Sequence, residues 1–126
     1  MTDIPNTIYT GQVAEQQACD FLLANGLELL KRNYRCRSGE IDLIMRDRDD
    51  VVFVEVRVRN NPRYGNAFES VTRHKQKKIV KTATYYLYQQ KWFNKVNCRF
   101  DVIGISYAQT KATVEWIKDA FPANPF

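Results

Sequence analysis

Residues 39–60, GEIDLIMRDRDDVVFVEVRVRN, decide the fold of this 126-residue chain. Two runs rich in Val, Ile, Leu and Phe flank the acidic segment DRDD, and this pattern is typical of two antiparallel strands joined by a turn. We therefore predict strands over residues 40–46 and 51–58, with residues 47–50 as a four-residue hairpin loop.

The length of this loop fixes the register of the two strands. Arg46 then pairs with Val51, and counting back along both strands sets Asp42 opposite Glu55. Directly opposed residues of an antiparallel pair have Cβ atoms roughly 5 Å apart, so the two carboxylates are predicted to lie side by side. The same count sets Ile44 opposite Phe53 and Glu40 opposite Arg57.

The two carboxylates need a compensating charge. Like charges at this distance repel, and the apolar residues around them strengthen the repulsion by lowering the local dielectric. A divalent cation would compensate, because Mg²⁺ prefers one or two carboxylates together with water and phosphate oxygens. An ion-pair network with Arg57 and Arg59 would also compensate, and the residues alone leave both interpretations open.

Helical and strand patterns alternate along the rest of the chain. Apolar spacing and the candidate caps Thr10, Gly26 and Thr72 predict helices over residues 9–25 and 73–90. Further strands are predicted over residues 27–35, 97–107 and 112–118. The order α-β-β-β-α-β-β indicates an α/β fold in which a mixed central sheet is flanked by helices. The length favours a single domain over residues 1–126, with residues 120–126 as a loose tail.

The net charge of the chain moderately favours polyanionic partners. Nineteen Lys and Arg against fourteen Asp and Glu give a net charge of +5. A basic face of the second helix is a candidate track for a nucleic-acid backbone, although such a face is more often simply solvated. Its members are Arg73, Lys75, Lys77, Lys78 and Lys81.

Aromatic residues near this helix have several interpretations. Tyr64, in the predicted loop before the helix, is placed to stack on an unpaired base or to pack against the protein. Tyr85, Tyr86 and Tyr88 recur at helical spacing, which indicates core and rim packing rather than a platform for bases. Asp101 is expected to pair locally, with Arg99 or a loop donor, and to stay out of the active centre.

The cysteines and the N-terminal residues indicate the cellular compartment in which the protein is expected. The three cysteines are widely spaced and form no CxxC pair, so neither a disulfide framework nor a zinc site is expected. The start, MTDIPNTIYT, has no basic segment followed by an apolar one and is not expected to act as a signal peptide. No apolar run is long enough to cross a bilayer, so we expect a cytoplasmic protein with no membrane partner.

The acidic pair and the arginine after it resemble the motif of the PD-(D/E)xK nuclease superfamily. In that superfamily an Asp on one strand and Glu-x-Lys on the next hold a metal ion and the attacking water. The matching residues are Asp42, Glu55 and Arg57, with Ile41 in the place of the proline. Arg57 therefore departs from the motif, which has lysine at this position.

The resemblance extends over nearly the whole chain. The segments GQVAEQQACDFLLANGLELLKRNYRCRSGEIDLI, VFVEVRVR, YGNAFESV, KQKKI and RFDVI are similar in content and order to the YraN-like family of bacterial proteins. That family is similar in fold to the archaeal Holliday-junction resolvases, which implies a restriction-endonuclease-like core. Those resolvases carry a further acidic residue on the first helix, and Glu15 occupies that place here, although an exposed helix glutamate is the commoner case.

This resemblance implies a metal-dependent endonuclease that hydrolyses phosphodiesters in DNA, with branched or damaged DNA as candidate substrates. Mg²⁺ or Mn²⁺ would be held by Asp42, Glu55 and the Val56 carbonyl, with Glu15 positioning water or a second ion. A homodimer would suit the two strands of a branched substrate.

Arg57 keeps a second interpretation open. Its guanidinium can stabilise charge on a phosphate, but with a pKa above about 12 it cannot accept a proton. A salt bridge from Arg57 to Glu40 or Asp42 is expected in the metal-free protein. The alternatives are a catalytically inactive nucleic-acid-binding module with the same fold and a scaffold whose basic helix meets an acidic protein.

Overall fold

The computed structural model describes residues 7–59, 68–108 and 111–123. Its elements follow the predicted order α-β-β-β-α-β-β, and the short 3₁₀ helix η2 precedes the second long helix. Their bounds are α1 Thr7–Ala24, β1 Glu28–Cys36, β2 Gly39–Asp47, β3 Asp50–Arg59, η2 Phe68–Ser70, α2 Arg73–Gln90, β4 Cys98–Ala108 and β5 Lys111–Phe121. The predicted α/β fold class is confirmed.

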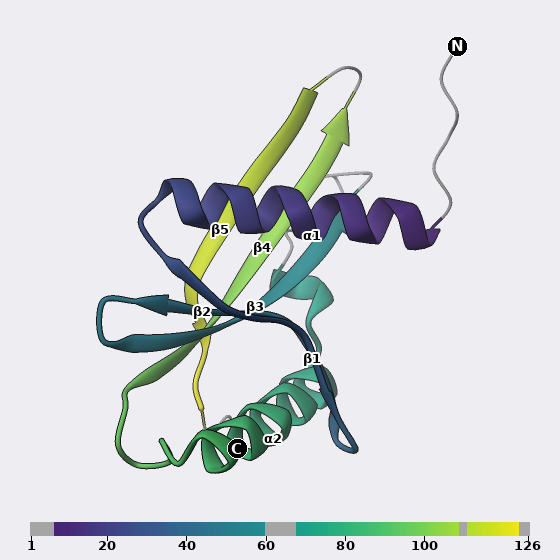
Figure 1. Cartoon of the computed structure of the whole chain (residues 1–126). Coiled ribbons are helices and arrows are strands. Elements are labelled where there is room, and N and C mark those ends of the chain that lie inside the picture. The colour runs from purple at the N-terminus through teal and green to yellow at the C-terminus, as the bar shows by residue number, and fades with distance from the viewer. Residues whose placement is uncertain (1–6, 60–67, 109–110, 124–126) are drawn as a thin grey trace.

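The five strands form one mixed sheet in the order β1-β2-β3-β4-β5. Every neighbouring pair is antiparallel except β3 and β4, which run parallel and are joined through α2. A parallel pair needs such a crossover, because a short hairpin turn can only reverse the chain. Figure 1 shows α1 on one side of the sheet and α2 on the other, so the sheet is covered on both faces.

Strand β3 explains why the apolar run in the middle of the sequence is nearly continuous. Val51 and Phe53 belong to the core cluster under α2, whereas Val52 and Val54 belong to the cluster under α1. Successive side chains of a strand point to opposite faces, so a strand covered on both faces is apolar at every position. Glu55 is the first residue of β3 to break this run.

Two of the three predicted helix caps are present in the structure. Thr72 caps α2 by accepting a hydrogen bond from the Lys75 backbone N–H at 3.2 Å, as predicted. Gly26 adopts φ +92° just after α1, which glycine tolerates because it lacks a Cβ. The prediction for Thr10 is wrong, since α1 begins at Thr7 and Thr10 lies inside it.

The β2–β3 turn is tighter than predicted, but the register is unchanged. Asp47 pairs with Asp50, which leaves a two-residue turn with Arg48 in the left-handed region at φ 59°. The four-residue loop was wrong because Asp47 and Asp50 extend the ladder by one pair. The predicted pairs of Arg46 with Val51 and Ile44 with Phe53 are both present.

The end of the chain is held more firmly than expected. Strand β5 includes Ala120 and Phe121, which the sequence placed in the loose tail. The Phe121 ring is buried and stacks on Phe100 with ring centroids 5.1 Å apart, and burying an aromatic ring in this way stabilises the strand end. In the described part of the chain, neither long helix is apolar enough to span a bilayer.

Candidate active site

The acidic pair lies where β2 and β3 stop pairing as a regular ladder. The ladder runs from the turn to the pair Leu43–Val54, and Asp42 is the next residue of β2. The Asp42 carboxylate accepts a hydrogen bond from the backbone N–H of Val56 at 2.8 Å, so a side chain takes the place of a backbone partner. Its carboxyl group also shares a hydrogen bond with that of Glu55.

Burial raises the pKa of both carboxyl groups of this pair, and the charge of Glu55 raises that of Asp42 further. Burial, followed by the charge of Glu55, raises the pKa of Asp42 to about 7, against an ordinary value of 3.8. Burial also raises the pKa of Glu55, while the nearby cations of Arg57 and Lys75 act in the opposite direction. Two partly buried carboxyl groups in contact cannot both ionise cheaply, so they share a proton close to neutral pH.

Arg57 is turned toward the pair by a residue from outside the hairpin. Its Nε donates to the Ser70 hydroxyl at 2.9 Å, and its Nη1 lies 3.4 Å from a Glu55 carboxylate oxygen. The predicted bridge to Glu40 or Asp42 is wrong. Glu40 instead contacts Arg35 at 3.0 Å, because these two residues pair across β1 and β2.

Glu15 comes to the same place from α1. Its pKa is raised by partial burial and then by the charge of Asp42, while a hydrogen bond from the Asn33 side chain lowers it. Glu15 is therefore near enough to Asp42 for their charges to interact. We call Glu15, Asp42, Glu55 and Arg57 the acidic cluster.

Asn33 is the contributor that sequence reasoning missed. It adopts φ 50° in β1, at a point where the pairing of β1 with β2 skips from Arg32 to Tyr34. Asparagine enters this left-handed region more readily than most residues, so it suits such an irregularity. A polar Asn in the middle of a predicted strand was the only available signal.

The basic residues of α2 begin beside the acidic cluster and continue away from it. Lys75 lies near enough to Glu55 for its charge to lower the carboxyl pKa. The whole basic set is exposed: Arg73, Lys75, Lys77, Lys78 and Lys81. Tyr64, the remaining predicted contact, lies outside the described residues.

The donor set near Asp42 fits a magnesium-like ion better than a soft metal. The N–H and carbonyl of one strand residue point to the same side, so the Val56 carbonyl is directed toward the edge where its N–H meets Asp42. Among the described residues, no three His, Cys, Asp or Glu side chains are grouped closely enough to cage an ion. Two carboxylates and a carbonyl suit Mg²⁺, which keeps several waters and often binds substrate phosphate.

Residues 14–105, which include the whole acidic cluster, match the model of the uncharacterised protein family UPF0102. The chain belongs to this family. It is 47% identical to a UPF0102 protein of Nitrosococcus oceani over 111 residues, 88% of this chain and 90% of the relative. It is 46% identical to a UPF0102 protein of Legionella pneumophila over 113 residues, 90% of this chain and 94% of the relative. The predicted membership of a bacterial, YraN-like family is confirmed.

Asp101 has a structural role in this UPF0102 protein. It is fully buried and accepts hydrogen bonds from Arg99 Nε at 3.1 Å, Trp116 Nε1 at 2.9 Å and the Asp119 N–H at 2.9 Å. These donors come from β4 and β5, so Asp101 ties the two strands together. The predicted local partner Arg99 is confirmed, and Asp101 lies outside the acidic cluster.

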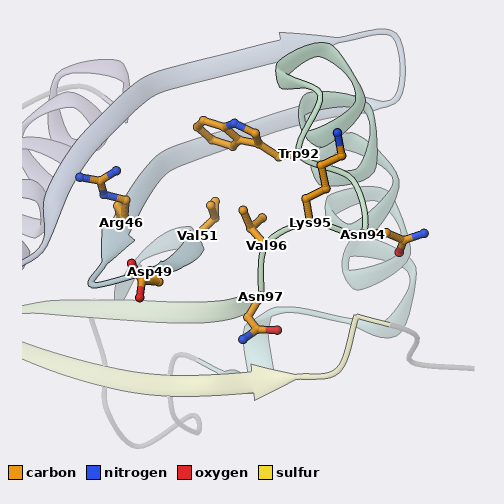
Figure 2. A pocket seen from close by; sticks show the side chains of 8 residues that line it. All are labelled: Arg46, Asp49, Val51, Trp92, Asn94, Lys95, Val96 and Asn97. Carbon is orange, nitrogen blue, oxygen red and sulfur yellow. The ribbon is translucent and has the colours of Figure 1, made fainter.

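The UPF0102 chain also has a pocket of about 470 Å³ at the turn end of β2 and β3 (Figure 2). Val51 and Trp92 form part of its apolar wall, and Arg46 and Lys95 supply two cations. None of the acidic cluster lines it. Since the turn lies at one end of the β2–β3 pair and the acidic cluster at the other, the two features are separate.

Proposed function

We propose that this UPF0102 protein is a Mg²⁺- or Mn²⁺-dependent endonuclease of the PD-(D/E)xK type that hydrolyses phosphodiester bonds in DNA. The observation that carries the proposal is the partly buried contact between Asp42 and Glu55 beside Arg57. Arg57 and the Val56 N–H compensate the charge of this pair only in part, since the pKa of both carboxyl groups is still raised. Such a pair is costly in a folded protein, so its presence favours a function that uses it. Branched and damaged DNA are the candidate substrates.

Asp42, Glu55 and the Val56 carbonyl would hold the ion. When bound, a divalent cation supplies Lewis acidity, which activates water and neutralises charge on the phosphate. Binding also removes the repulsion between the two carboxylates, because both can then be ionised.

Arg57 and Glu15 would act on the phosphate and on water. In hydrolysis the water oxygen bonds to phosphorus, one ester P–O bond breaks, a proton leaves the water and the departing oxygen gains one. Arg57 is oriented by Ser70 and would stabilise the added negative charge at phosphorus. It cannot accept the proton of the water. Glu15, close to Asp42, would position the attacking water.

The basic side chains of α2 would hold the DNA backbone. We predict that reversing the charge at Lys77, Lys78 and Lys81 together weakens DNA binding at least about tenfold at low salt, because several phosphate contacts are lost. The slope of log affinity against log salt should become shallower by up to about three units. Fluorescence anisotropy over a salt series measures both quantities.

A charge-reversal variant on another surface is the control for this prediction. Lys31 and Arg35 lie exposed on β1, and reversing them changes the net charge without touching α2. An unchanged salt slope in the α2 variant, or an equal loss in the β1 variant, would contradict the proposed DNA contact.

The test of the nuclease proposal is cleavage of linear duplex, single-stranded and branched DNA with Mg²⁺ or Mn²⁺. Cleavage should require the metal and should disappear in Glu55→Gln, which keeps the size of the side chain but removes its charge. Retained cleavage in Glu55→Gln would indicate a contaminating nuclease. Binding of metal without cleavage of any substrate would overturn the proposal.

The second candidate is a DNA-binding module that has lost the chemistry. Arg57 in the place of the superfamily lysine favours it. This candidate predicts DNA binding through α2 that is insensitive to divalent ions and to Glu55→Gln, together with no cleavage.

A further inference from the structure

The solvent-exposed face of α2 carries more than positive charge. Residues separated by three, four or seven positions share one face of a helix. Lys78, Lys81, Tyr85 and Tyr88 are related in this way and are all exposed. The opposite face of α2 packs on the sheet through side chains that include Ile79, Ala83, Tyr86 and Leu87.

Two of these exposed residues are aromatic, which is unusual. Tyr85 is 51% exposed and Tyr88 is 59% exposed, and they account for two of the four large hydrophobic side chains exposed among the described residues. Of the three tyrosines expected to pack as core and rim, only Tyr86 is buried. The sequence pattern could not separate them, since it does not show how deeply each side of the helix is covered.

Tyr88 is held as part of a flat aromatic surface. Its ring stacks on that of Phe93, with centroids 4.3 Å apart and an angle of 13° between the planes. Phe93 follows the end of α2, so the stack limits the motion of Tyr88 while leaving most of it open to solvent. A ring fixed in this way loses less conformational entropy when another flat group stacks on it.

We infer that this face of α2 binds single-stranded nucleic acid, with phosphates on Lys78 and Lys81 and unpaired bases on Tyr85 and Tyr88. The inference rests on the proposed function and names its substrate class, DNA with a single-stranded segment. Two cationic side chains followed by two aromatic ones on one helix face suit an unpaired strand, because the cations can bind its backbone and its bases are free to stack. In a duplex the bases already stack on one another, so only the cations would be used.

The position of α2 connects this surface to the acidic cluster. Lys75, near the start of the helix, lies close to Glu55, and Tyr88 follows thirteen residues later. At a rise of 1.5 Å per residue, these two positions are about 20 Å apart along the helix. A strand lying along this face would therefore extend from the aromatic pair toward the carboxylates.

The test compares the affinity of short single-stranded and duplex oligonucleotides in EDTA, where no cleavage occurs. Changing Tyr85 and Tyr88 together to alanine should weaken single-strand binding roughly tenfold to a hundredfold, because two stacking contacts are lost. Duplex affinity should change less than about twofold. The matched variant with phenylalanine at both positions keeps both rings and should bind single strands like the wild type.

Photo-crosslinking gives a second readout on the wild-type protein. An oligonucleotide carrying 5-iododeoxyuridine should crosslink to the peptide that contains Tyr85 and Tyr88, and excess unlabelled single strand should compete more strongly than duplex. This measurement decides the question even if the alanine variant fails to fold. Crosslinks confined to other peptides would overturn the inference.

The remaining outcomes separate this inference from the nuclease proposal. The alanine variant could lose single-strand and duplex binding equally, or lose neither. Either result would overturn the single-strand surface, and metal-dependent cleavage could still be present. Tyrosine-dependent single-strand binding by a protein that cuts no DNA would support the surface and reject the nuclease. Absence of nucleic-acid binding, with binding of an acidic peptide instead, would reject both.

Discussion

Replacing Asp42 with asparagine is expected to abolish binding of Mn²⁺ and Mg²⁺ and to stabilise the metal-free protein at neutral pH. Asparagine is similar in size to aspartate, and its carbonyl oxygen can still accept the hydrogen bond from the Val56 N–H. Its amide can donate to Glu55, so the repulsion between the two carboxylates is replaced by a hydrogen bond. The same substitution removes one of the two carboxylates that are proposed to bind the metal ion.

The size and pH range of the stabilisation follow from the pKa of Asp42. Its pKa is raised from 3.8 to about 7 in the folded protein, so between these values the folded state binds more protons than the unfolded state. Stability therefore falls as the pH rises from about 4 to about 7. A pKa shift of this size corresponds to a loss on the order of 4 kcal/mol in the free energy of unfolding. Asp42→Asn should restore most of this stability.

Thermal unfolding in EDTA from pH 4 to pH 8 measures the stability, and calorimetry with Mn²⁺ measures the metal affinity. Glu28→Gln is the control, because Glu28 is an exposed carboxylate that pairs with Arg46 and does not act on the pKa of Asp42. Neither quantity should change appreciably in Glu28→Gln. Equal Mn²⁺ affinity in the wild type and in Asp42→Asn would reject this metal site.

Replacing Arg57 with alanine is expected to lower the rate of DNA cleavage by about 10²-fold or more. The guanidinium lies 3.4 Å from Glu55 and is oriented by Ser70, so it supplies a fixed positive charge beside the carboxylates. Without it, negative charge that develops at the phosphorus is left without this stabilisation. Arg57→Lys should retain or increase the rate, because lysine restores the superfamily pattern.

Single-turnover cleavage with Mg²⁺ measures this effect, and Mn²⁺ calorimetry on the same variants separates chemistry from metal binding. Arg35→Ala is the control, since Arg35 is an exposed arginine whose partner is Glu40 and not the acidic pair. Cleavage that appears only in Arg57→Lys would show that arginine silences the enzyme. Wild-type rates in Arg57→Ala would remove Arg57 from the proposed mechanism.

The sequence by itself determined the element order and the register of the central hairpin. Alternation and turn chemistry are local properties, so the runs on either side of DRDD specified two strands, and the turn fixed Ile44 opposite Phe53. The N-cap at Thr72 and the end of the first helix near Gly26 were also predicted from the sequence, because helix ends depend on local residues. The proximity of Asp42 and Glu55 followed from the register alone.

The tertiary structure decided which other groups meet the acidic pair. Glu15 lies 27 residues before Asp42, and only the packing of α1 on the sheet brings its charge close. Counting along the hairpin gave Arg57 the wrong partner, because Glu40 also has a neighbour in β1 and Ser70 approaches from outside the hairpin.

The exposure of Tyr85 and Tyr88 was likewise decided by the sheet that α2 covers. Local patterns encode the backbone conformation, whereas the partners and burial of a side chain depend on elements that are distant along the chain.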